Sequence, residues 1–111
     1  MEKVARYQKL IRELLEEWAE VRESEENVEN QVIVDTIQNH FQLVRVGWVG
    51  DKYIFSPMIH FDIKNDKIWL QANFTDADVA RELVDKGVPR QDIVLGFQPP
   101  YVRPHTEYGV A

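Results

Sequence analysis

The sequence has no cysteine and only five glycines and five prolines in 111 residues. Without cysteine the chain has no disulfide framework, no thiolate ligand for zinc or an iron–sulfur cluster, and no thiol nucleophile. Long apolar runs are also missing. The longest stretch without Asp, Glu, Lys or Arg is Ile93 to Val102, well short of the roughly 18 apolar residues of a membrane span. The N-terminus carries Glu2, Lys3 and Arg6 where a secretory signal needs apolar residues. We therefore expect a soluble, cytoplasmic protein that does not associate with membranes.

Basic residues are outnumbered, with 13 Lys and Arg against 19 Asp and Glu and a net charge of -6. A protein that binds DNA by itself neutralises phosphates with clustered Lys and Arg side chains. The sequence has no such cluster, so we predict that this chain contacts DNA only within a complex. A chain of this length also has too little apolar surface for two cores, and we expect a single domain over residues 1–111.

The hydrophobic pattern changes once along the chain. Apolar residues at helical spacing predict an amphipathic helix over about residues 2–22, and a polar loop follows over residues 24–30. Beyond it, β-branched and aromatic residues predict four strands, over residues 32–37, 41–49, 53–63 and 67–74. Because the intervening turns are short, the strands should form an antiparallel meander.

The C-terminal third predicts a second helix and a short strand. Thr75 is expected to cap this helix, which should end at Lys86 before Gly87 and Pro89. A short fifth strand is expected over residues 93–97, followed by an extended proline-rich tail. The predicted fold class is therefore α+β: an N-terminal helix, a four-stranded meander, a second helix, a short strand and the tail.

Two strand patterns predict which side chains are buried and which are open to a partner. Strict alternation in the third strand places Tyr53, Phe55 and Pro57 on the same side as the apolar residues 59, 61 and 63. Trp48 and Trp69 instead share their strand faces with polar residues. Because Trp is enriched at interaction hot spots, this half-polar face is expected to be covered by the tail, a second subunit or another protein.

His60 and Asp62 alternate on one strand and so face the same side, and His40 lies on a neighbouring strand. Two histidines and one carboxylate are a donor set for non-haem iron, but the same residues also suit a hydrogen-bonded polar sheet face. The pattern leaves open a small metal-dependent enzyme or nuclease subunit that uses His40, His60 and Asp62. Our main prediction is a protein with no metal, no cofactor and no catalytic residues.

The order and spacing of several segments resemble one protein family over nearly the whole chain. The segments are Asp35-Thr36, His40-Phe41-Gln42-Leu43, Gly47-Trp48, His60-Phe61-Asp62-Ile63, Lys67-Ile68-Trp69-Leu70-Gln71, Gly87-Val88-Pro89-Arg90-Gln91-Asp92-Ile93-Val94-Leu95-Gly96-Phe97, Pro100-Tyr101-Val102-Arg103 and Thr106-Glu107. They resemble the XisI family, the fdxN-element excision controlling factors of cyanobacteria.

This resemblance implies a non-catalytic accessory role in programmed excision of the fdxN DNA element during heterocyst differentiation. A site-specific recombinase would exchange the strands, and a XisH-like protein, itself similar to restriction nucleases, would be the direct partner. Exposed sheet faces and edges also favour a homodimer. The residues expected to form the interaction or signature surface are Asp35, His40, Trp48, His60, Asp62, Trp69, Gly96, Pro100, Arg103 and Thr106.

Overall fold

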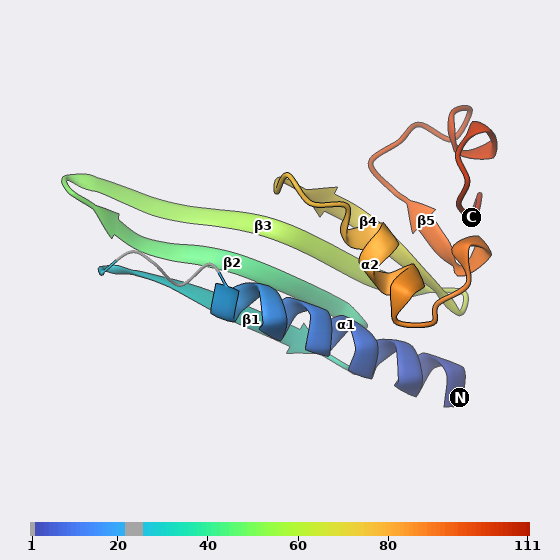
Figure 1. Ribbon diagram of the computed structural model, residues 1–111, viewed down its shortest axis with the longest axis horizontal. Coiled ribbons are helices and arrows are strands. Elements are labelled where there is room, and N and C mark those ends of the chain that lie inside the picture. Colours follow the sequence, from blue (N-terminus) through green and yellow to red (C-terminus); the bar gives the residue numbers. More distant parts are fainter. Residues whose placement is uncertain (1, 22–25) are drawn as a thin grey trace.

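Two helices cover one face of a five-stranded sheet in the computed structural model, which describes residues 2–21 and 26–111 (Figure 1). The elements in chain order are α1 (Glu2–Val21), β1 (Val28–Asp35), β2 (His40–Val49), β3 (Lys52–Lys64), β4 (Lys67–Asn73), α2 (Val79–Asp85), the 3₁₀ helix η1 (Arg90–Asp92), β5 (Ile93–Leu95) and the 3₁₀ helix η2 (Arg103–His105). The predicted α+β class and order of elements are confirmed. The expected helix end at residue 22 and loop residues 24 and 25 lie outside the described residues.

The sheet has the order β1-β2-β3-β4-β5, and its first four strands form the antiparallel meander that the short turns predict. Asn65 and Asp66 have φ values of 52° and 63° in the β3–β4 turn, as a tight two-residue hairpin requires. β5 pairs with β4 in parallel, because the segment between them carries the chain back along the sheet through α2.

The core lies between the helices and the sheet. α1 contributes Tyr7, Ile11, Leu14 and Leu15, each at most 1% exposed. They belong to one cluster with buried residues of the sheet and α2, namely Phe41, Leu43, Ile59, Phe61, Ile63, Ile68, Leu70, Val79, Ala80, Leu83 and Ile93. Full burial of one such Leu, Ile or Phe side chain contributes about 1.5–3 kcal/mol. In the described part of the chain, no helix combines the length and apolarity that a membrane crossing demands.

The first strand starts and ends earlier than predicted, since β1 runs from residue 28 to 35 rather than from 32 to 37. Its polar first half pairs with β2 through backbone bonds, which do not depend on side-chain type. The end is set by Asp35, whose Oδ1 accepts hydrogen bonds from the amides of Ile37 and Gln38, both at 2.9 Å. This side chain turns the chain out of the sheet and leaves Ile37 87% exposed.

The predicted cap of the second helix is wrong. Asp78 caps α2, because its Oδ1 accepts the amide hydrogen of Arg81 at 3.0 Å. Thr75 instead donates its hydroxyl to Asn73 Oδ1 at 2.6 Å in the preceding turn. The predicted end of this helix is correct, since Lys86 is the C-cap of α2 and Gly87 has a φ of 107°.

The ends of the fifth strand and of the tail also differ from the prediction. β5 stops at Leu95, two residues before the expected end. The tail is not extended throughout, because residues 103–105 form η2 with Pro104 in its first turn, where a missing amide hydrogen costs nothing.

The predicted facing of the third strand is wrong for its first half. Met58 has no partner in the register with β2, because Leu43 pairs with Ile59 and Val44 pairs with Pro57. One extra residue reverses the alternation, so Tyr53, Phe55 and Pro57 lie on the face opposite to Ile59. Tyr53 is 54% and Phe55 67% exposed. The bulge therefore moves aromatic side chains from the expected core to the surface.

Candidate functional site

The face of the sheet opposite to the helices brings together three predicted residues, His40, His60 and Asp62, hereafter the His–Asp cluster. His40 pairs with Asp62 in the register of β2 and β3, and His60 lies two residues before Asp62 on β3. His40 Nδ1 lies 2.7 Å and His60 Nε2 2.8 Å from the same atom, Asp62 Oδ1. One potential ligand atom of each residue lies within 4.8 Å of the other two.

Two glutamine side chains orient the cluster. Gln71 Nε2 donates to the second carboxylate oxygen of Asp62, Oδ2, at 3.2 Å. Gln42 Nε2 lies 3.1 Å from His60 Nδ1 and, in this amide orientation, donates to it. Each polar group of His60 and Asp62 therefore has a partner, while the side chain of His40 is 56% exposed. Gln42 and Gln71 were not among the predicted site residues. Alternation along β2 and β4 nevertheless places them on the same sheet face as the His–Asp cluster.

Asp62 is ionised at neutral pH. Burial alone raises the pKa of this carboxyl, but hydrogen bonds from His40, His60 and Gln71 stabilise the charge and hold its pKa below the ordinary value of 3.8. The cluster therefore presents a carboxylate with two imidazoles on one of its oxygens. Such a group can hold protons between the imidazoles and the carboxylate, or it can bind a cation.

A second group, hereafter the tail corner, consists of Trp69, Gly96, Arg103 and Thr106 and joins β4 to the C-terminal tail. The guanidinium carbon of Arg103 lies 5.1 Å from the centroid of the Trp69 ring. Arg103 also donates to the carbonyls of Gln98 at 3.1 Å and Gly96 at 3.4 Å. Thr106 Oγ1 donates to the carbonyl of Arg103 at 2.9 Å. These contacts hold the tail over Trp69, so this tryptophan is covered within the chain itself.

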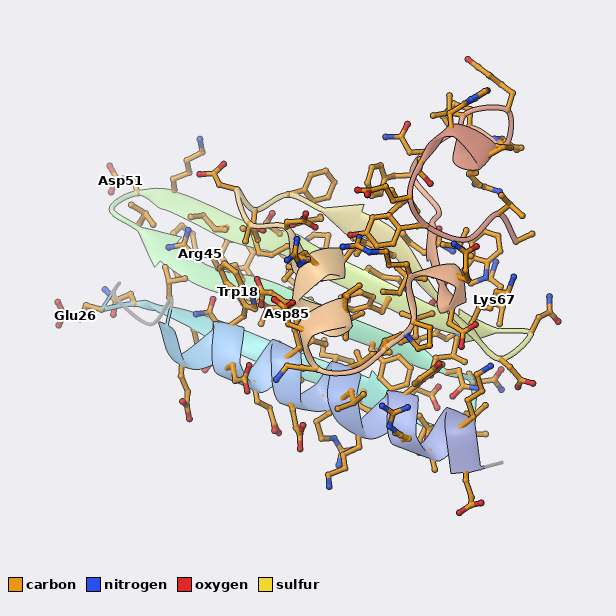
Figure 2. All side chains as sticks on the ribbon, turned by 45° about the vertical axis from the view of Figure 1, so that its right-hand side comes forward. Trp18, Glu26, Arg45, Asp51, Lys67 and Asp85 are labelled. Carbon is orange, nitrogen blue, oxygen red and sulfur yellow. The ribbon has the colours of Figure 1, made fainter. Side chains whose placement is uncertain are left out.

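A third group, hereafter the hairpin patch, consists of Trp48, Tyr53 and Phe55 near the tip of the β2–β3 hairpin. Trp48 is 52% exposed, and its ring centroid lies 5.1 Å from that of Tyr53. Figure 2 shows Asp51 at the tip of this hairpin and Lys67 at the other end of the sheet, and Figure 1 shows the hairpin extending beyond α1. The patch is separate from the tail corner. Pro57 lies within β3 next to the bulge, and a proline inside a strand is the sequence feature that could have indicated this bulge and the exposure of Phe55.

Of the other two predicted residues, Asp35 ends β1 and Pro100 lies in a turn of the tail. Asp35 forms the turn after β1, where backbone amides of Gln38 and Ile37 hold the pKa of its carboxyl below the ordinary value. Pro100 is exposed and follows Pro99, whose carbonyl accepts from the amide of Val102 at 2.9 Å. Both residues shape loops, and in the structure neither contacts the His–Asp cluster through a hydrogen bond of its side chain.

The architecture defines a small two-layer α+β protein whose open sheet face carries a polar cluster and an exposed aromatic patch. This chain belongs to the XisI family, because the family model described as XisI protein matches residues 1–110. No protein with a curated description matches the sequence.

Two solved structures are similar to this chain over nearly their whole length. A XisI-like protein from Anabaena variabilis ATCC 29413 is 53% identical, with a TM-score of 0.92 over 97% of this chain and 99% of the other. The fdxN element excision controlling factor XisI from the same strain is 28% identical, with a TM-score of 0.83 over 98% of this chain and 99% of the other. The second of these proteins is described as a controlling factor.

Proposed function

We propose that this chain is a non-catalytic controlling factor for programmed excision of a DNA element and acts by binding a XisH-like protein. The proposal includes the fdxN element, heterocyst differentiation and an indirect link to a site-specific recombinase. Membership of the XisI family and similarity to a protein described as an fdxN element excision controlling factor support the general role. The observation that carries the mode of action is the hairpin patch, where three large aromatic side chains are more than half exposed.

The chemistry of this patch suits a protein better than DNA. Aromatic residues are enriched in the centres of protein interfaces, where burial removes them from water. The chain has a net charge of -6, and the patch residues themselves carry no positive charge for phosphate contacts. We therefore expect the chain by itself to show no salt-dependent affinity for DNA. Such affinity should arise when the partner is bound.

Co-expression with the XisH-like protein of the same genome tests the proposal, followed by purification and mass determination. We expect a stable complex. If Trp48 is a hot spot of the interface, Trp48→Ala should weaken binding of the partner by about 30-fold, equivalent to about 2 kcal/mol. Tyr101→Ala is the matched control, because Tyr101 is 78% exposed but lies in the tail. No complex, or equal weakening by Trp48→Ala and Tyr101→Ala, would contradict the proposal. Among the described residues, the outer edge of β1 is unpaired within the sheet and therefore favours a homodimer. In the mass determination of the chain alone, this homodimer would have twice the mass of 13.1 kDa.

The His–Asp cluster supports a second candidate function, a small metal-dependent enzyme or nuclease subunit. The cluster supplies three suitable metal ligands. The side chains hydrogen-bonded to it, however, are the amides of Gln42 and Gln71, which do not act as general acids or bases. The geometry therefore supports binding of a metal more directly than turnover. Metal-dependent hydrolysis of DNA that is lost in His60→Ala would favour the enzyme.

A further inference from the structure

We infer that His40, His60 and Asp62 form a binding site for one divalent first-row transition-metal ion, with Zn²⁺ as the ion to test. The inference does not depend on the proposed partner or on DNA excision. It starts from the convergence of three ligand atoms of different residues within 4.8 Å of one another. Because β2 and β3 are directly paired, the sheet holds the Cα atoms of these residues in fixed register.

The donor set matches this class of metal. Two imidazoles and one carboxylate are the protein ligands of many zinc and non-haem iron sites, whereas Mg²⁺ and Ca²⁺ prefer oxygen ligands. Ligand atoms around a tetrahedral zinc ion, bound at about 2.0–2.2 Å, lie about 3.3 Å apart. The two nitrogens now lie 2.7 and 2.8 Å from Asp62 Oδ1, so each must move away from this oxygen by about 0.5 Å on metal binding. The ligand atoms lie within 4.8 Å of one another, so the two nitrogens must also approach each other by up to about 1.5 Å. The half-exposed His40 has room for that movement.

The neighbouring amides provide the support that metal ligands require. Gln71 holds the second oxygen of Asp62 and so orients the carboxylate. A metal on His60 Nε2 requires the ring proton on Nδ1, which must then donate a hydrogen bond. Gln42 can accept this bond from its present position after a half-turn of its amide, which places the carbonyl oxygen opposite Nδ1. The same side chain therefore serves both the metal-free and the metal-bound ring.

The surroundings leave a coordination position open. His40 is 56% exposed and His60 25%, so the cluster opens to solvent on the helix-free face. Asp35 is the register partner of His40 across the β1–β2 turn and adds a second carboxylate near the site. Three protein ligands leave one tetrahedral position for water or for a donor atom of another molecule.

Titration of the metal-free 111-residue chain with Zn²⁺, followed by calorimetry and native mass spectrometry, tests the site. We expect one ion per chain and a melting temperature that rises with Zn²⁺ concentration. His40→Ala and His60→Ala should each abolish the one-to-one binding. His105→Ala is the matched control, because His105 is exposed in η2 and should leave binding unchanged. Gln42→Ala should weaken binding by about 10- to 100-fold.

Three results would overturn the inference. They are no one-to-one binding by the wild-type chain, binding that survives in His40→Ala and His60→Ala, and binding that is lost equally in His105→Ala. Circular dichroism checks that each variant is folded. If His60→Ala does not fold, His40→Ala decides alone, because a side chain that is 56% exposed can be removed without opening the core. Co²⁺ provides a second readout, because its visible absorption bands gain intensity when the hydrated ion enters a tetrahedral protein site, and this gain should be absent in His60→Ala.

Discussion

Tyr7→Phe is expected to lower the stability of this fold by about 2 kcal/mol at neutral pH, the middle of the range for a hydrogen bond to a charged group. Tyr7 is 1% exposed, and its hydroxyl donates to Asp92 Oδ2 at 2.5 Å. The bond joins α1 to η1, directly before β5. Phenylalanine keeps the ring in the core but leaves the carboxylate with the ammonium of Lys3, 3.0 Å away, as its remaining partner.

The loss should depend on pH, because both partners titrate. Burial raises the pKa of Asp92, but hydrogen bonds from Tyr7 and Lys3 outweigh it and hold the pKa below 3.8. A carboxyl whose pKa is lower in the folded state than in the unfolded state stabilises the fold when the pH is above its unfolded-state pKa. That stability is lost as the pH falls through the folded-state pKa. Burial and the bond to Asp92 raise the pKa of Tyr7 above 10.0, so its contribution is lost as the pH rises beyond 10.0. The difference between wild type and Tyr7→Phe should therefore be largest near neutral pH.

Urea unfolding followed by circular dichroism measures this difference. At about 4 °C per kcal/mol for a chain of this size, the melting temperature should also fall by about 8 °C. Tyr101→Phe is the control, and its effect should stay within about 0.5 kcal/mol because Tyr101 is 78% exposed. A double-mutant cycle with Asp92→Asn assigns the coupling to this pair. A loss below about 0.5 kcal/mol at neutral pH, or one that is the same at about pH 3, would refute the reasoning.

Two further substitutions test the tail corner and the revised helix start. Gly96→Ala should destabilise the fold by about 1–3 kcal/mol, as overpacking does, because a Cβ atom there would lie 2.3 Å from Gln71 Oε1 and 3.3 Å from Trp69 Cε3. A thermal melt measures it, and an unchanged melting temperature would show that Gln71 moves aside freely. Asp78→Ala should remove the cap of α2 and cost about 1 kcal/mol in urea unfolding, and a variant as stable as wild type would mean that another group caps the helix.

The local elements were predictable because they depend on short-range patterns. The helical spacing of Tyr7, Ile11 and Leu14 requires one apolar face, and α1 buries that face. The two-residue turn at Asn65-Asp66 permits only neighbouring antiparallel strands, as β3 and β4 are. The N-cap of α2 was predicted wrongly because threonine and aspartate are both preferred at N-cap positions, so the sequence does not distinguish Thr75 from Asp78. The turn after β4 uses Thr75 for its own hydrogen bonds.

The bulge at Met58 was not predictable from alternation alone. Alternation continues only while each residue has one partner, and the pairing of Leu43 with Ile59 and of Val44 with Pro57 leaves Met58 without one. This single insertion decides that Phe55 faces solvent rather than the core. The exposed hairpin patch, and with it the surface that we propose for a partner, is therefore a consequence of the pairing between two strands.

Short-range patterns along the chain specify the α+β class, the meander and the alternation that places His60 and Asp62 on one side of a strand, because each depends on neighbouring residues. The sequence placed His40 on a neighbouring strand, but its contact with Asp62 Oδ1 is a result of strand pairing. Its position depends on the register of β2 with β3, which pairs residues that are distant in sequence. The contact of Arg103 with Trp69 depends likewise on how the tail returns to the sheet after β5. Contacts between distant segments are selected by packing of the whole chain, and no local pattern specifies them.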